Sequence, residues 1–161
     1  MTDRRTFLTL SGLGAAALSF FGLRSRDAEA KEAFPVTLPD AEWKRRLSPA
    51  AYATLRHEAT ERPGSSPLNA EKRAGTFACA GCGQPLFSSK TKFESGTGWP
   101  SFWAPLKGAV GTRTDRSMFI ARTEVHCARC GGHLGHVFND GPRPTGKRYC
   151  MNGVAMTFRA A

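Results

Sequence analysis

The chain has 161 residues, a length that suits one domain of ordinary size. Its hydrophobic content of 40% and charged content of 22% are typical of a globular protein, and no heptad array, collagen period or long internal repeat indicates a fibrous or solenoid class. The formal net charge of +10 is compatible with an anionic partner but does not require one.

Residues 1–30 have the pattern of an export signal. Arg4-Arg5 precede an uncharged run from Thr6 to Leu23, and the segment ends in the small-x-small triplet Ala28-Glu29-Ala30. Paired arginines followed by x-Phe-Leu resemble a bacterial twin-arginine signal, which predicts transfer to the periplasm by the twin-arginine export machinery. The uncharged run is close to the minimum spanning length, so an uncleaved membrane anchor is the alternative.

The segment after the export signal predicts two short helices. Residues 31–39 are expected to form an extended lead-in, because prolines interrupt them. Asp40 is expected to cap a short helix that begins at Ala41. Ser48-Pro49 supplies an N-cap and a favourable first helical residue, so we expect a second helix that ends near Arg56.

The chain beyond residue 60 is rich in short apolar or alternating runs. The 17 Gly and 10 Pro favour turns and short strands over long helices. We expect strands in the following segments: 76–78, 86–88, 117–121 and 154–158. The pattern predicts a mainly β, antiparallel domain over residues 40–161, with a small helical preface.

Four of the 5 cysteines lie in two near-identical turns. These are Cys79-Ala-Gly-Cys82-Gly83 and Cys127-Ala-Arg-Cys130-Gly131. Four thiolates are the ligand set of a closed tetrahedral zinc site, and the doubled Cys-x-x-Cys turn is typical of one. The two turns are far apart in the sequence, so one zinc ion would hold distant strands together. The alternative is two disulfides, which an oxidising compartment would permit.

The fifth cysteine, Cys150, lies in the segment 147–153. If this segment is a strand, Cys150 shares one face with Arg148 and Asn152. A guanidinium beside a thiol favours the thiolate, which is the nucleophilic form. The alternative is a free buried cysteine that acts as a small hydrophobic residue.

Two further segments carry candidate site residues. His133 and His136 lie between glycines, with Asp140 nearby, and are candidates for proton donors or metal ligands. The donor role is the better interpretation, because four cysteines already complete the metal site. Trp99 and Phe102 lie in an aromatic loop held by Gly and Pro. Such aromatics are more often core residues, but a Trp face can also hold a soft sulfur group with its methyls.

Together these motifs resemble the B-type peptide methionine-R-sulfoxide reductases. The resemblance covers about residues 40–159, in the order found in the family. The matching segments are 60–63, 79–87, 92–102, 127–130, 133–138, 140–142 and 148–150. The resemblance implies a fold of two twisted antiparallel sheets with a zinc-ribbon-like site of four cysteines.

The resemblance also implies a role for each candidate residue. Cys150 would be the nucleophile, Trp99 would line the pocket for the substrate methyl group, and Phe102 would be a second substrate-binding aromatic. The residues expected around the reacting sulfoxide are His133, His136, Asp140, Arg148 and Asn152. The substrates would be oxidised proteins and peptides, and the enzyme would repair them under oxidative stress.

The implied chemistry begins with protonation of the sulfoxide oxygen by a histidine or by a water that it holds. The Cys150 thiolate then attacks the sulfur, methionine leaves, and Cys150 becomes a sulfenic acid. Many relatives carry a resolving cysteine at the position of Thr97. We therefore expect a one-cysteine enzyme that is regenerated by an external thiol such as a thioredoxin-like protein, and that acts as a monomer on the R epimer.

Two other classes of protein fit part of the pattern. A basic zinc-ribbon module would bind nucleic acid, but the export signal and the scattered positive charges argue against a nucleic-acid partner. A thiol redox sensor or isomerase would use the Cys-x-x-Cys pairs, which a bound metal would make unreactive. Both rank below the reductase.

Overall fold

The computed structural model describes residues 33–117 and 120–161. The predicted export signal at residues 1–30 therefore lies outside the described residues. Within the described part of the chain, no helix has both the length and the apolar character needed to cross a bilayer.

The first helix, α1, spans Asp40–Arg46. The prediction that Asp40 caps this helix from outside is wrong, because the helix begins at Asp40 and Pro39 occupies the N-cap without a side-chain hydrogen bond. The Asp40 carboxylate instead accepts a hydrogen bond from the Tyr52 hydroxyl in the next helix. The carboxylate that the local sequence assigned to the helix cap therefore makes a contact between the two helices instead.

The second helix, α2, spans Pro49–His57 and begins as the sequence predicts. The Ser48 side chain accepts a hydrogen bond from the amide of Ala51, and Pro49 occupies the first helical position. Leu55 on α2 and Trp43 on α1 are both buried in the core. The two helices thus contribute one apolar face to the domain.

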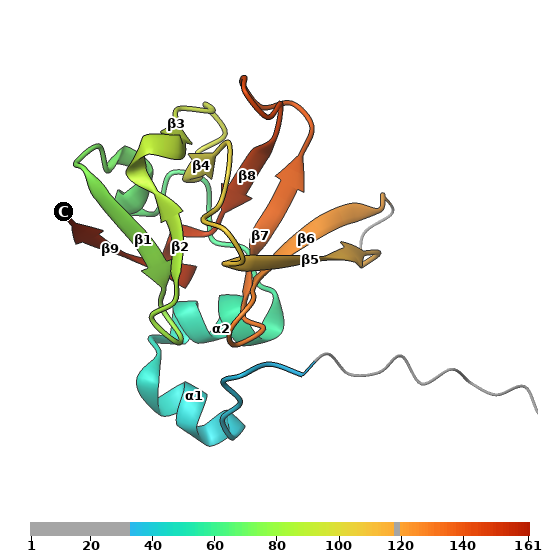
Figure 1. Cartoon of the computed structure of the whole chain (residues 1–161). Coiled ribbons are helices and arrows are strands. Elements are labelled where there is room, and N and C mark those ends of the chain that lie inside the picture. The colour runs from blue at the N-terminus through green and yellow to red at the C-terminus, as the bar shows by residue number, and fades with distance from the viewer. Residues whose placement is uncertain (1–32, 118–119) are drawn as a thin grey trace, which may run out of the picture. The chain divides into compact units, whose positions relative to one another are not determined.

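Nine strands form two antiparallel sheets over the described residues (Figure 1). The three-stranded sheet has the order β2-β1-β9 and consists of β1 (Gly75–Cys79), β2 (Pro85–Ser88) and β9 (Met156–Ala160). The six-stranded sheet has the order β3-β4-β8-β7-β6-β5. Its strands are β3 (Lys92–Phe93), β4 (Ser101–Phe102), β5 (Val110–Asp115), β6 (Arg122–Cys127), β7 (His133–Phe138) and β8 (Arg148–Met151). Three short 3-10 helices complete the described part of the fold: η1 (Pro67–Ala70), η2 (Ser89–Thr91) and η3 (Gly153–Ala155). The predicted class, mainly β with two short N-terminal helices, is confirmed.

Two predicted strands differ from the structure. The apolar run at 117–121 lies between β5 and β6, where Ser117 and Ile120 are outside any strand and residues 118–119 are not described. Ile120 is 76% exposed, so its hydrophobicity does not report a buried strand face. The segment 154–158 begins in η3 and enters β9 only at Met156.

The core lies between the two sheets and is anchored by aromatic rings. Phe87 of β2 stacks on Phe102 of β4 with ring centroids 4.3 Å apart, and Phe77 of β1 meets Phe102 edge-on at 4.9 Å. All three rings are fully buried. Because Phe102 belongs to the six-stranded sheet and its partners to the other, these contacts join the sheets.

Candidate active site and metal centre

The four cysteines of the paired turns converge on one point. Cys79 ends β1 and Cys127 ends β6, while Cys82 and Cys130 lie in the turns that follow these strands. All four Sγ atoms lie within 4.8 Å of one another. None of the four is in a disulfide, so the structure does not support the alternative of two disulfides.

The two turns have the same backbone hydrogen bonds, as their similar sequences predict. The amide of Gly83 donates to the Cys79 carbonyl at 2.9 Å, and the amide of Gly131 donates to the Cys127 carbonyl at 2.8 Å. Both glycines have positive φ angles, 73° and 67°, which a side chain would disfavour. Each turn therefore directs two sulfurs to the same side.

The spacing of the sulfurs fits a tetrahedral metal ion. The Sγ atoms of Cys79 and Cys130 are 3.7 Å apart, and those of Cys82 and Cys127 are 3.6 Å apart. Four sulfurs at the usual zinc–sulfur bond length would be separated by about 3.8 Å in a regular tetrahedron. The cluster therefore has the ligand number, chemistry and spacing of a closed structural metal site.

A separate cavity of about 200 Å³ contains Cys150. Its lining residues are Thr60, Trp99, Arg122, Gly135, His136, Phe138, Cys150 and Asn152. Four of the predicted site residues, namely Trp99, His136, Cys150 and Asn152, thus meet in one place. The lining combines aromatic side chains with polar ones, which suits a ligand that carries both a methyl group and a polar oxygen.

Cys150 lies in β8 between two register partners on the neighbouring strands. His136 of β7 and Ser101 of β4 both lie directly opposite Cys150, so all three side chains share one face of the sheet. Gly135 lets β7 approach this closely, because a Cβ atom there would collide with the Cys150 carbonyl. Cys150 is half-buried, and the next residue, Met151, points into the core.

Arg148 lies two residues before Cys150 on the same strand. Its guanidinium makes a bidentate pair with Asp140, with both N–O distances 2.9 Å, and lies 4.4 Å from the centre of the Phe138 ring. The hydrogen bonds from Arg148 lower the pKa of Asp140, and the same pair raises the pKa of Arg148. Neither side chain lines the cavity, but Arg148 also interacts with the Cys150 sulfur.

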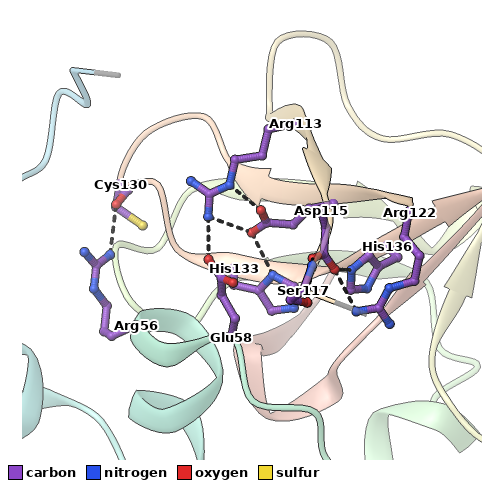
Figure 2. Close-up of polar contacts among 10 residues, drawn as sticks. Arg56, Glu58, Arg113, Asp115, Ser117, Arg122, Cys130, His133 and His136 are labelled. Carbon is purple, nitrogen blue, oxygen red and sulfur yellow. Dashed lines mark hydrogen bonds and ion pairs between the residues drawn. The ribbon is translucent and has the colours of Figure 1, made fainter. Parts of the chain in front are cut away.

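The two histidines are each held by a carboxylate from the hairpin of β5 and β6 (Figure 2). His136 Nε2 lies 2.8 Å from Asp115 Oδ2, and Arg122 Nη2 lies 2.7 Å from the same oxygen. Ser117 donates its amide and its hydroxyl to the other oxygen of Asp115. Hydrogen bonds from Ser117, His136 and Arg122 keep the pKa of Asp115 low.

Burial lowers the pKa of His136, while the hydrogen bond to Asp115 opposes this effect. The ring is therefore largely neutral at neutral pH. An ionised Asp115 fixes the proton of the neutral ring on Nε2, so Nδ1 is the unprotonated nitrogen.

His133 lies deeper than His136 and does not line the cavity. Its Nδ1 is 2.7 Å from Glu124 Oε1, and its ring centre is 5.4 Å from that of His136. Arg113 also pairs with Glu124 and reaches Glu58 at 2.8 Å (Figure 2). Burial of Glu124 favours its neutral form, but the hydrogen bonds from His133 and Arg113 outweigh this and lower its pKa.

Asn152 and Trp99 are fixed to the backbone of Glu61. The Asn152 carbonyl accepts from the Glu61 amide at 3.0 Å, and its amide group donates to the Leu134 carbonyl at 3.1 Å. Trp99 Nε1 donates to the Glu61 carbonyl at 3.1 Å. The Glu61 carboxylate accepts from the amides of Gly153 and Val154, so this residue ties the loop before η1 to the end of β8.

The prediction that Phe102 contacts substrate does not fit its position. Its side chain is fully buried between the sheets and does not line the cavity. Trp99 lines the cavity, whereas Phe102 belongs to β4 and lies in the core.

Sequence reasoning missed several residues of the site. Those that support or line it are Thr60, Glu61, Asp115, Arg122 and Glu124. Glu124 lies on β6, which pairs with β7, whereas Asp115 lies on β5, one strand further from the histidines. Their approach to His133 and His136 therefore becomes visible only once the arrangement of β5, β6 and β7 is known.

Comparison with known proteins assigns the chain to a family. Residues 47–160 match the SelR domain model. The chain belongs to the SelR-domain, or MsrB, family. It is 55% identical over 121 residues to the peptide methionine sulfoxide reductase MsrB of Methanosarcina barkeri. The matched residues cover 74% of this chain and 85% of the relative. It is also 50% identical over 127 residues to the MsrB of Leptospira interrogans, covering 78% of this chain and 97% of the relative. A third relative, the MsrB of Agrobacterium fabrum, is 51% identical over 124 residues, covering 76% and 92%.

Proposed function

We propose that the chain is a peptide-methionine (R)-S-oxide reductase in which Cys150 is the nucleophile. Membership of the MsrB family supports the activity. The observation that carries the assignment of the nucleophile is the location of the fifth sulfur. Cys150 lies in the cavity with Trp99, His136 and Asn152, whereas the other four cysteines belong to the metal cluster.

The proposed reaction oxidises Cys150 while it reduces the substrate. The sulfoxide oxygen accepts a proton from the protonated form of His136, and the Cys150 thiolate attacks the sulfur, so that a sulfur–sulfur bond forms and the oxygen leaves as water. A water molecule then attacks the Cys150 sulfur, breaks the sulfur–sulfur bond and releases methionine. The methionine sulfur is reduced by two electrons and the Cys150 sulfur is oxidised by two, which leaves methionine and a cysteine sulfenic acid.

His136 is the better placed of the two histidines to act at the sulfoxide oxygen, because it lines the cavity. His133 lies behind it, buried and paired with Glu124, and supports the position of the His136 ring. Trp99 offers an apolar surface for the substrate methyl group. Asn152, with both ends of its side chain bonded to backbone, shapes the wall of the cavity.

We propose that an external thiol regenerates the enzyme. The Thr97 hydroxyl lies 3.7 Å from the Cys150 sulfur, and the other four cysteines belong to the metal cluster. A first thiol would condense with the sulfenic acid, releasing water and forming a mixed disulfide, and a second would release Cys150 as a thiol. Disulfide mapping after one turnover without reductant should find Cys150 oxidised but unbridged. An intramolecular disulfide to Cys150 in metal-loaded protein would contradict this proposal.

The catalytic proposal is tested by turnover of the two sulfoxide epimers. We expect reduction of methionine-R-sulfoxide and none of the S epimer, and we expect Cys150→Ser to abolish turnover. Cys82→Ser is the comparison, since it removes a sulfur from the cluster and leaves Cys150 in place. Full activity of the Cys150→Ser variant would exclude Cys150 as the nucleophile.

We further propose zinc as the metal of the cysteine cluster and export as the role of residues 1–30. The four thiolates would hold zinc as a structural ion, which connects β1 with β6 and takes no part in the reaction. The twin-arginine pattern at Arg4-Arg5 supports delivery to the periplasm. Replacing both arginines by lysine should prevent export in cell fractionation, and unchanged export would contradict the proposal.

A further inference from the structure

A chain of three hydroxyl groups leads from the buried edge of β4 to the Cys150 sulfur. Ser101 Oγ lies 2.7 Å from Ser95 Oγ, which lies 2.8 Å from Thr97 Oγ1, which lies 3.7 Å from Cys150 Sγ. Ser101 is fully buried, and the other two hydroxyl residues are half-buried. None of these contacts involves the metal cluster or the histidines.

The direction of the hydrogen bonds in this chain is set at its buried end. Ser101 Oγ donates to the Trp99 carbonyl at 3.1 Å, and a carbonyl can only accept. A hydroxyl has one proton, so when Ser101 gives it to this carbonyl, Ser101 accepts at its 2.7 Å contact with Ser95 and Ser95 is the donor. The same count makes Thr97 the donor to Ser95.

Thr97 therefore presents only oxygen lone pairs to Cys150. The thiol of Cys150 has a proton that it can donate to these lone pairs, and so has a cysteine sulfenic acid. A thiolate has none, so the contact gains nothing when Cys150 ionises. For Thr97 to donate to the thiolate, the whole chain would have to reverse, and the Ser101 hydroxyl would leave the Trp99 carbonyl.

We propose that Ser101 and Ser95 are positioning residues that orient the Thr97 hydroxyl as an acceptor toward Cys150, so that the chain favours the proton-bearing forms of this residue. The resting thiol is thus kept less reactive than it would be without the chain. After oxidation the same contact holds the proton of the sulfenic acid. The proposal rests on the proposed function only in taking Cys150 as the reacting residue.

The other groups that face Cys150 are charged or titratable and must be held constant in a test. They are Arg148 on β8, His136 opposite on β7, and Arg122, which lines the same cavity from β6. Substitutions in the hydroxyl chain leave all three in place. A difference between these variants and the unchanged protein in the pH dependence of Cys150 alkylation therefore reports the effect of the hydroxyl chain.

The test measures the pH dependence of Cys150 alkylation by iodoacetamide in the zinc-loaded, full-length protein. Mass spectrometry of the peptide that contains Cys150 separates this thiol from the four cluster cysteines. We expect Ser101→Ala to free Ser95 and Thr97 to turn toward the thiolate. The midpoint of alkylation should then fall by roughly half to one pH unit, the equivalent of one hydrogen bond. Ser95→Ala should lower the midpoint in the same way. Because Ser95 is only half-buried, this variant replaces Ser101→Ala in the test if Ser101→Ala does not fold.

Two comparisons make the result specific. In a Thr97→Val background, Ser101→Ala should no longer move the midpoint, because its effect passes through the Thr97 hydroxyl. Thr91→Val removes a hydroxyl that also donates to carbonyls but lies outside the chain, and it should move nothing. An unchanged or raised midpoint in Ser101→Ala and Ser95→Ala, or an equal fall in both backgrounds, would overturn the proposal. Because alkylation needs no sulfoxide turnover, this outcome is separate from failure of the proposed activity.

Discussion

At the scale of single residues, the site depends on how each polar group is held by its neighbours. His136 lines the cavity, but its tautomer and orientation are set by Asp115, which is held by Ser117 and Arg122. Such partners of a reacting group commonly affect activity almost as strongly as the group itself. Asp115 is therefore the residue at which to test whether the hairpin of β5 and β6 supports catalysis.

We expect Asp115→Asn to lower the pKa of His136. The hydrogen bond to the carboxylate opposes the lowering caused by burial, so its loss leaves burial unopposed and moves the pKa further below the ordinary value of 6.5. As the pH rises, the His136 ring of the variant then loses its proton at a lower pH than in the unchanged protein. An NMR titration of His136 measures the shift, and kcat/KM for the R-sulfoxide should fall about 10- to 100-fold.

The control for this variant is Asp40→Asn, on α1, which removes an exposed carboxylate remote from the cavity. It should leave both the titration of His136 and kcat/KM unchanged. A rise in the pKa of His136 in Asp115→Asn would show that the carboxylate does not act on the ring as described.

At the scale of elements, local signals were predictable and cross-strand signals were not. Ser48-Pro49 predicts the start of α2, because capping depends on neighbours within one turn. The placement of Cys150 on a strand was also predictable, and alternation along that strand sets the face that its side chain occupies. The pairs of Asp115 with Arg122 and of Arg113 with Glu124 depend on the register of β5 and β6, which the sequence did not provide.

The same limit explains the misplaced strand. The apolar character of 117–121 suggested a buried strand, whereas β5 and β6 on either side carry many polar residues. Several of these polar residues pair across the hairpin, and Asp115 and Glu124 reach the histidines. A hydrophobicity pattern therefore underestimates strands whose role is to carry charged partners to a site.

The close packing of β7 against β8 gives a prediction at this scale. In Gly135→Ala the added methyl group would meet the Cys150 carbonyl, so β7 must move away from β8 and carry His136 with it. We expect a loss of stability of about 2–4 kcal/mol in denaturant unfolding, and at least a 100-fold loss of kcat/KM.

Gly108→Ala is the matched control, because it has open space around the added methyl group and a φ angle of 67°. Its cost should be only the backbone strain of about 1–2 kcal/mol, with kcat/KM unchanged. Equal effects of the two variants on activity would mean that the approach of β7 to β8 does not position the site.

At the scale of the whole molecule, the two sheets are joined at separate places by different forces. The Phe77, Phe87 and Phe102 rings join them through apolar packing. The cysteine cluster joins them again, since Cys79 ends a strand of one sheet and Cys127 ends a strand of the other. The active-site cavity contains none of the cluster residues, so a metal there would affect activity only through the fold.

Removal of the metal should therefore destabilise the molecule before it changes the chemistry of Cys150. We expect purified protein to contain about one equivalent of zinc per chain, held by the four thiolates. Chelation should lower the Tm by roughly 10 °C or more, because a structural metal binds only the folded state. Cys79→Ser should show the same loss of zinc and of Tm. Cys150→Ser should keep both the zinc and the Tm and lose only turnover. The two variants therefore distinguish the metal-binding cysteines from the proposed nucleophile. A protein whose Tm is unchanged after complete removal of zinc would show that the aromatic core alone holds the sheets together.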